Sequence, residues 1–407
     1  MRGANLLVGP LVTGFLLLAV AVGFGGCSGD AVPGVEPAHD RETSATEAET
    51  ETTPTVRPGT GCAAAGVVCT VLGMPGVSLN NGATGAAARF GLHFPTGVAV
   101  AADGTVYVTD ESNHRVVALD AAGQVTTIVG TGFVGDSQGG PLATAPLHGP
   151  TALAWVAGTA SVAPGALIVA LRGTNKIVKA DLVAGQLSVL GGTGERGYDG
   201  DGPAREHMLG APRGVAVGPD GSIYLADTDN HLIRVIRPDG ALETLAGTPS
   251  VPGHAGDGGP AKDAALHTPV GLALVGGDLV FADSGSQTIR KIALATGTMT
   301  LVAGGVDQPG FADGTAADAR FHYPTGVAAH DGAILVTEEY NHCVRRVDLA
   351  TGAVSRYAGT CGTSGFGGDL GPREDALLSS PMGVATSAAG DVYVADTANQ
   401  VVRAIHR

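Results

Sequence analysis

Six variants of one sequence phrase recur along this chain of 407 residues. Each copy begins with Pro-x-Gly-Val-Ala or a close variant, passes through a short apolar stretch to Asp-x-x-Asn-His, and ends near Ala-Gly-Thr. The anchoring prolines lie 55 to 62 residues apart and are Pro95, Pro150, Pro212, Pro269, Pro324 and Pro381. A period of this length indicates a repeat architecture, which restricts the fold more than any single motif does.

Each copy predicts four short strands. In the first copy, β-rich runs at 98–100, 105–109, 116–119 and 125–129 are separated by glycine-containing turns and by the Asp-x-x-Asn-His motif. Four antiparallel strands in an up-and-down meander form the blade of a β-propeller, whose radial closure protects the sheet edges. We therefore expect one blade for each copy.

The last copy predicts how the ring closes. It stops after its third strand, at 401–405, whereas a β-rich segment at 67–73 precedes the first copy and has no blade of its own. We expect this N-terminal strand to complete the last blade. The predicted fold class is all-β, a six-bladed β-propeller closed by strand exchange.

Three stretches carry a family resemblance. The run Ile-Tyr-Leu-Ala-Asp-Thr-Asp-Asn-His-Leu-Ile-Arg at 223–234, and its counterparts at 392–403 and 106–117, resemble NHL repeats. The resemblance covers about residues 62–407 and implies a six-bladed propeller. NHL propellers include binding platforms, such as the ectodomains of bacterial sensor kinases and of teneurins. They also resemble a few lyases, among them the peptide-amidating lyases and virginiamycin B lyase.

The N-terminus is typical of an export signal. A basic start and an apolar stretch at 6–22 precede Gly-Gly-Cys27, so we predict a signal peptide of the lipoprotein type over 1–26. Cys27 resembles the lipobox cysteine of bacterial lipoproteins, which carries the lipid, although Phe24 departs from the leucine usual in that family. Ordinary secretion and an uncleaved membrane anchor are the alternatives. Each of the three exports the chain, so we expect a protein of the bacterial cell envelope, periplasmic or on the cell surface.

Two further domains follow the signal. Residues 27–60 are rich in Glu, Thr, Ala and Pro and poor in apolar residues, a composition that predicts a disordered tether. Residues 61–407 are the predicted propeller. Four cysteines remain in it, an even number that permits two disulfides in an exported chain. We favour Cys62–Cys69 and Cys343–Cys361; a zinc site is the alternative, but no Cys-x-x-Cys spacing occurs.

The recurring acidic residues favour a structural interpretation. A short carboxylate beside a tight turn accepts backbone N–H bonds, and a residue present in nearly every blade serves the blade. We therefore predict structural turn residues at Asp110, Asp227, Asp283 and Asp396, with Glu338 in the fifth copy and Arg172 as the replacement in the second. The recurring Gly-Asp-Gly-Pro theme in the long loops, as at 200–203, also favours a turn over a calcium site, because the later bidentate Glu is absent.

Histidines supply the one uneven feature near the channel. The position two residues before the anchoring proline holds a histidine in four copies: His93, His148, His267 and His322. Imidazoles converging at a channel mouth bind transition metals, so a metal site is one hypothesis, and a hydrogen bond to a loop carbonyl is the alternative that we favour.

Two other recurring columns are assigned to the surface. The histidines of the Asn-His pairs, His114, His231 and His342, alternate with Gln287, Gln400 and Lys176 and are expected to be solvated. The arginines of the third strands, such as Arg234, Arg290, Arg345 and Arg403, are also expected to lie on the surface.

The predicted function is a binding module. The net charge of −15 and the lack of a basic run argue against nucleic acid as a partner. No unique catalytic constellation occurs, so we predict a lipid-anchored, monomeric propeller that binds a protein, peptide or glycan on one face, without catalysis and without a cofactor. The alternative is a metal-dependent lyase or hydrolase that uses the four histidines.

Overall fold

The computed structural model describes residues 62, 64–80, 82–157 and 165–407. The chain divides into two units, 1–54 and 55–407, and all described residues lie in the second. The predicted signal peptide, Cys27 and nearly all of the tether therefore lie outside the described residues. In the part that is described, no helix is long and apolar enough to cross a membrane.

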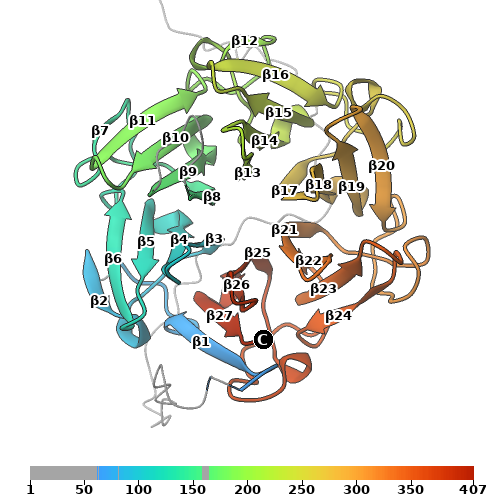
Figure 1. Cartoon of the computed structure of the whole chain (residues 1–407). Helices are drawn as coiled ribbons and strands as arrows, with labels where there is room; N and C mark the ends of the chain where they lie inside the picture. Colours follow the sequence, from blue (N-terminus) through green and yellow to red (C-terminus); the bar gives the residue numbers. More distant parts are fainter. Residues whose placement is uncertain (1–61, 63, 81, 158–164) are drawn as a thin grey trace, which may run out of the picture. The chain divides into compact units, whose positions relative to one another are not determined.

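Six antiparallel sheets form a ring around a central channel (Figure 1). This arrangement confirms the predicted all-β, six-bladed propeller. Each sheet is one blade, and its first strand lies nearest the channel in the figure.

The first three blades carry an additional short strand at the outer edge. Blade 1 contains β2 (Thr84–Ala86), β3 (Pro95–Val100), β4 (Val106–Asp110), β5 (Arg115–Leu119) and β6 (Gln124–Val129). Blade 2 contains β7 (Gly140–Pro141), β8 (Pro150–Val156), β9 (Ala166–Leu171), β10 (Lys176–Asp181) and β11 (Gln186–Gly191). Blade 3 contains β12 (Gly202–Pro203), β13 (Gly214–Val217), β14 (Ile223–Asp227), β15 (Leu232–Ile236) and β16 (Ala241–Ala246).

The other three blades have four strands each. Blade 4 contains β17 (Pro269–Val275), β18 (Asp278–Asp283), β19 (Thr288–Ala293) and β20 (Thr298–Ala303). Blade 5 contains β21 (Pro324–His330), β22 (Ala333–Glu338), β23 (Cys343–Asp348) and β24 (Val354–Ala358). Blade 6 contains β25 (Pro381–Thr386), β26 (Val392–Asp396), β27 (Val401–Ile405) and β1 (Val68–Gly73).

Short 3₁₀ turns connect many of these strands. Five of them join the second and third strands of a blade: η2 (Glu111–Asn113), η3 (Arg172–Thr174), η5 (Thr228–Asn230), η7 (Ser284–Ser286) and η9 (Thr397–Asn399). The other four lie in the loops between blades: η1 (Ala87–Arg89), η4 (Ala204–Glu206), η6 (Ala261–Asp263) and η8 (Arg373–Asp375).

Blade 6 is assembled from both ends of the propeller. β1 pairs antiparallel with β27, from Val68 opposite Ile405 to Gly73 opposite Val401. The two disulfides predicted from the sequence are present in the structure. Cys62–Cys69 ties β1 to the residues before it, and Cys343–Cys361 joins the start of β23 to the loop after β24.

The hydrophobic core lies between neighbouring blades. In one of its clusters Leu72 and Val402 of blade 6 pack with Val98 and Val108 of blade 1. Because every blade is covered by a neighbour on each side, its second strand is buried on both faces. This explains why β9 is a continuous apolar run, Ala-Leu-Ile-Val-Ala-Leu, in which all six residues are buried.

Glycine lets the first strands approach one another around the channel. A Cβ atom added to Gly271 of β17 would overlap the carbonyl oxygen of Thr325 in β21, and one added to Gly326 would overlap that of Met382 in β25. The glycine of the Pro-x-Gly phrase is therefore a packing requirement, since only hydrogen fits between the strands.

Candidate functional site at the channel mouth

A buried carboxylate ends the second strand in five blades. These residues, the column carboxylates, are fully buried: Asp110, Asp227, Asp283, Glu338 and Asp396. One carboxylate oxygen accepts the backbone N–H of the residue two before the anchoring proline, as in Asp283 with His267 (2.7 Å) and Asp396 with Ser379 (2.7 Å). Each carboxylate thus fastens the end of the second strand to the start of the first, by bonds that would otherwise be missing from a turn.

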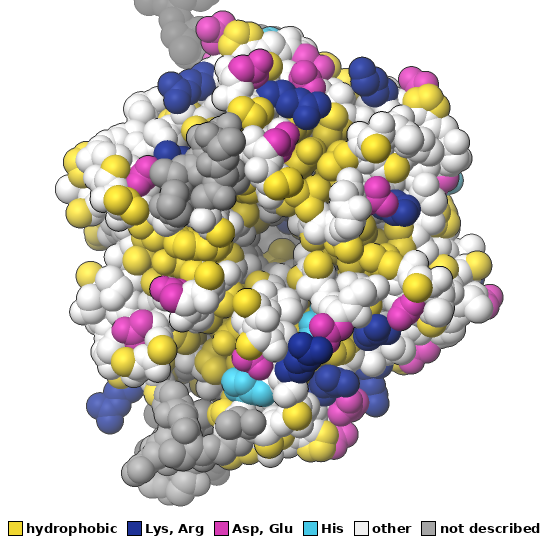
Figure 2. Space-filling view, in the orientation of Figure 1, with side chains coloured by type: hydrophobic (Ala, Val, Ile, Leu, Met, Phe, Trp, Pro, Cys, Tyr) yellow, Lys and Arg dark blue, Asp and Glu magenta, His cyan; other side chains and the backbone are white. Residues whose placement is uncertain are grey.

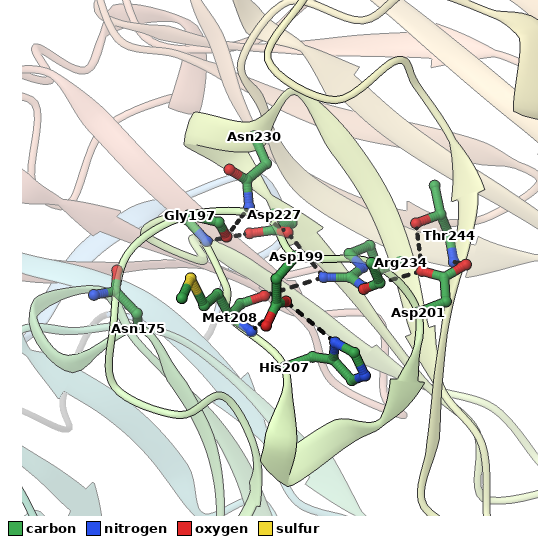
Figure 3. A network of polar contacts seen from close by, with 12 residues as sticks. Asn175, Gly197, Asp199, Asp201, His207, Met208, Asp227, Asn230, Arg234 and Thr244 are labelled. Carbon is green, nitrogen blue, oxygen red and sulfur yellow. Dashed lines mark hydrogen bonds and ion pairs between the residues drawn. The ribbon is translucent and has the colours of Figure 1, made fainter.

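The arginine column is buried, so its assignment to the surface was wrong. Arg234, Arg290, Arg345 and Arg403 are at most 1% exposed. Arg234 lies between Asp227, 3.5 Å away, and Asp201 of the preceding loop, 3.0 Å away (Figure 3). It also donates to the carbonyl oxygens of Met208 and Gly200. The strand alternation that suggested exposure fails here because the loop from the preceding blade covers this face.

The Gly-Asp-Gly-Pro loops supply the second carboxylate. Asp201, Asp257, Asp313 and Asp369 each form an ion pair with the buried arginine of their blade. Burial nevertheless dominates the titration of the column carboxylates. It raises the pKa of Asp227 and Asp396 to about 6 and that of Asp283 and Glu338 to about 7, against the effect of the arginines and hydrogen bonds.

Blade 2 departs from this arrangement, and its predicted alignment was off by one residue. The register places Leu171 opposite Lys176, as Asp110 lies opposite Arg115 in blade 1. Leu171, not Arg172, therefore occupies the position of the column carboxylate. Lys176 takes the place of the buried arginine and pairs with Asp136 at 2.6 Å.

A third column links each blade to the next. Its members, the latch residues, have positive φ and are His114, Asn175, His231, Gln287, His342 and Gln400. The side chain of each accepts the backbone N–H of the residue just before the next anchoring proline; for example, His231 Nδ1 accepts from Thr268 at 3.1 Å and Gln287 Oε1 from Tyr323 at 2.6 Å. The other four bonds run from Gly149, Ala211, Ser380 and Phe94. The member in blade 2 is Asn175 rather than Lys176, and these residues are half-buried scaffold.

The four histidines proposed as metal ligands stand on separate blades. His148 packs edge-on against His114, with ring centroids 5.6 Å apart, and His267 against His231 at 5.8 Å. His322 lies against Tyr340 at 5.0 Å. Within the described part of the chain no three His, Cys, Asp or Glu side chains lie close enough to hold a metal ion, so the structure does not bring His93, His148, His267 and His322 together.

The central channel contains a cavity of about 170 Å³, lined by the first strands of all six blades. Valine and leucine side chains form much of the wall, among them Val98, Leu153, Val215, Leu272 and Val327. On the face drawn in Figure 2, hydrophobic side chains surround the central opening. The opposite end of the cavity is polar, because Glu111, Arg172 and Arg213 line it there.

The polar end breaks the sixfold pattern at one position. The residue after the column carboxylate is a hydroxyl residue in blades 3, 4 and 6, and it donates to the carbonyl oxygen of the next anchoring proline. These bonds are Thr228 to Pro269 (2.8 Å), Ser284 to Pro324 (2.6 Å) and Thr397 to Pro95 (2.7 Å). In blades 1, 2 and 5 the same position holds Glu111, Arg172 and Glu339.

Another residue takes over the structural bond in those three blades. A threonine directly after the blade's own anchoring proline donates to the next proline carbonyl: Thr96 to Pro150 (3.4 Å), Thr151 to Pro212 (3.1 Å) and Thr325 to Pro381 (3.3 Å). The scaffold bond is thus kept by a second route. Glu111, Arg172 and Glu339 are free of this task and stand at the channel mouth instead.

Arg213 completes a group of four charges, the mouth quartet of Glu111, Arg172, Arg213 and Glu339. Arg172 pairs with the mostly buried Glu111 at 3.1 Å. Burial raises the pKa of both Glu111 and Glu339, and the nearby Arg213 opposes the rise in each case. The guanidinium Nε of Arg213 is buried without a hydrogen-bond partner. Such charged groups at an apolar cavity are suited to orient a small polar ligand.

The sequence analysis missed the mouth quartet. It searched the residues that recur and the long loops, whereas these four lie where a recurring hydroxyl is lost. A signal was present: the position after the column carboxylate changes from Ser or Thr to Glu or Arg in three of six copies.

Comparisons with known proteins support the fold. Residues 92–119, 209–236 and 321–347 match the family model described as NHL repeat. The chain is 33% identical over 251 residues to protein SUPPRESSOR OF QUENCHING 1, chloroplastic, of Arabidopsis thaliana, covering 55% of this chain and 22% of the relative. It is 26% identical over 328 residues to human NHL repeat-containing protein 2, covering 73% and 44%. The chain spans less than half the length of these curated relatives.

A solved structure shares the same architecture. A crystal structure described as an auxiliary nutrient binding protein from Bacteroides thetaiotaomicron superposes with a TM-score of 0.60 at 15% identity, covering 83% of this chain and 75% of the other. At this identity the similarity concerns the fold.

Proposed function

We propose that this chain, an NHL-repeat β-propeller, is an exported binding module that takes its ligand at the channel mouth. The observation that carries the proposal is the mouth quartet. Three of its members replace hydroxyl residues that serve the scaffold elsewhere, and a compensating threonine keeps the structural bond in each of those blades. Half-buried charges that the fold does not need are expected to serve recognition.

Binding without catalysis is the form of this function that we favour. The printed description of the Bacteroides structure as an auxiliary nutrient binding protein agrees with it. The mouth offers charges that hold and orient a ligand, next to an apolar cavity for a hydrophobic group.

A ligand screen tests the proposal. The full-length protein is heated with a library of metabolites, peptides and oligosaccharides, and compounds that raise its melting temperature are followed by NMR to detect conversion. We expect compounds that remain unchanged and whose effect is lost in Glu111→Gln and Arg172→Gln. Glu243→Gln and Arg237→Gln serve as matched controls, since they change an exposed ion pair in blade 3. Conversion of the compound, or equal binding by all four variants, would contradict the proposal.

Export and anchoring form a second part of the proposal. Two disulfides among the described residues agree with an oxidising compartment. We infer that Cys27 carries a lipid and that residues 27–60 tether the propeller to the membrane. Cys27→Ala should release the protein from the membrane fraction, and the N-terminal peptide of the natural protein should carry the mass of a lipid. An unmodified Cys27, with the protein in the soluble fraction, would exclude the anchor.

The metal-dependent lyase or hydrolase is kept as a separate hypothesis. Elemental analysis of protein purified with zinc, copper and nickel present tests it, since a site on the four histidines requires one bound metal for each chain.

A further inference from the structure

The mouth quartet contains one unpaired group of each charge. Arg172 and Glu111 satisfy each other, whereas Arg213 and Glu339 form no ion pair with any described residue. Both are partly buried, and each is close enough to affect the titration of the quartet. A partly buried charge without a partner is costly, so a ligand group of opposite charge would stabilise each of them.

Arg213 is the anion-binding candidate. Its position, directly after the anchoring proline, holds a threonine in three blades and an apolar residue, Val270 or Met382, in the other two. The guanidinium lines the cavity, and its buried Nε has no acceptor. Because a guanidinium presents a planar set of donors, a carboxylate is the group that fits it best.

Glu339 is the cation-binding candidate. Its partly buried carboxylate has no side-chain hydrogen bond with a described residue, and Arg213 lies close enough to oppose the rise of its pKa. The rings of Tyr323 and Tyr340, whose centroids are 5.3 Å apart, stand near both Glu339 and Arg213. Aromatic faces beside a carboxylate favour an ammonium group.

The cavity behind these charges accepts an apolar group. Val215 and Leu272 line it close to Arg213 in sequence and space, and its volume of about 170 Å³ is enough for an aliphatic side chain. A ligand that meets all three conditions carries a carboxylate, an ammonium group and a hydrocarbon branch.

We infer that the channel mouth binds an aliphatic amino acid or a short aliphatic peptide, with its carboxylate on Arg213, its ammonium group on Glu339 and a side chain in the channel. This inference rests on the proposed function, because it names the ligand class of the same site.

Calorimetric titration of the full-length protein tests the ligand class. The probes are leucine, leucyl-leucine and trileucine, each also as its C-terminal amide and as its N-acetyl derivative. We expect at least one unmodified probe to bind, and either modification to weaken its binding about tenfold or more. Equal binding of modified and unmodified probes would overturn the inference, and this comparison needs no variant.

Two variants then assign the charges. In Arg213→Gln, amidation should cause no further loss, and in Glu339→Gln, acetylation should cause none, because each variant lacks the partner of the altered group. Arg237→Gln and Glu243→Gln should behave like the natural protein. If amidation weakens binding equally in Arg213→Gln and in the natural protein, the assignment of the carboxylate is wrong.

The outcomes separate this inference from the proposed function. Absence of binding by all nine probes, together with a library compound that depends on Glu111, would overturn the ligand class and leave the binding module intact. Independence of every ligand from the mouth quartet would overturn both.

Discussion

At the scale of single residues, buried ion pairs replace much of what a larger aromatic core would do. Each of blades 3 to 6 places one arginine between a buried carboxylate and a second one in the preceding loop. The two partners are unequal: Asp227 is fully buried, whereas the side chain of Asp201 is 44% exposed. Removing the arginine leaves a buried charge without compensation, whereas removing the exposed carboxylate does not.

We therefore expect Arg234→Met to lower the free energy of unfolding by about 3–5 kcal/mol. Asp201→Asn should cost about 1 kcal/mol, because Asp227 still neutralises the arginine and water screens the exposed side. Denaturant unfolding of the two variants measures the difference. Equal losses would mean that the buried carboxylate contributes no more than the exposed one.

The sequence predicted recurring features of the residues better than their surroundings. The blades, the turn position of the aspartates and both cysteine pairs follow from local patterns. The burial of Arg234 does not, because it depends on a loop that begins more than thirty positions earlier and reaches it only in the closed fold. Blade 2 was misaligned because Leu171 and Lys176 have lost the acidic and basic residues that mark the phrase elsewhere. The quartet was missed because its members look like ordinary surface charges until the channel is seen.

At the scale of the blades, the latch residues alternate in chemistry around the ring. Histidine links blade 1 to 2, 3 to 4 and 5 to 6, and Asn175, Gln287 or Gln400 provides the other three links. Burial lowers the pKa of His114, His231 and His342. The neighbouring charges are His148 and His93 beside His114, His267 and Asp229 beside His231, and His322 beside His342. Only the histidine links accept a proton that abolishes the acceptor.

Acidification should therefore weaken three of the six links. Below a pH of about 6.5 the unfolded chain takes up protons on these histidines before the folded protein does, so the stability that neutral histidine provides is lost as the pH falls. Each lost hydrogen bond is worth about 1 kcal/mol. A triple variant, His114→Gln, His231→Gln and His342→Gln, keeps the acceptors and should lose less stability between pH 6.5 and 5.

The comparison isolates the histidines from other titrating groups. Burial raises the pKa of Asp283 and Glu338 to about 7, so their contribution to stability falls as the pH rises through the same range. Both proteins share these carboxylates. Identical pH profiles of the melting temperature in the natural protein and the triple variant would refute the histidine effect.

At the scale of the whole molecule, the pairing of β1 with β27 joins the two ends of the propeller. Deletion of residues 62–73 leaves blade 6 with three strands and exposes the edge of β27. We expect this deletion to abolish the cooperative thermal transition, because the loss includes inter-blade contacts of Val68 and Leu72 as well as one disulfide. Deletion of residues 28–58 is the control and should leave the melting temperature unchanged. Equal transitions in both deletions would show that the ring does not need β1.

This pairing also sets an order of events during synthesis. The strand that leaves the ribosome first, with the apolar sequence Val-Cys-Thr-Val-Leu-Gly, finds its partner only when the last strand has been made. Contacts between such distant segments form slowly, and an unpaired apolar strand is exposed to aggregation in the meantime. The Cys62–Cys69 bridge lies within this first segment and can form before the partner exists. Because all six first strands line the channel, a chain cut short at any blade has no binding site at all.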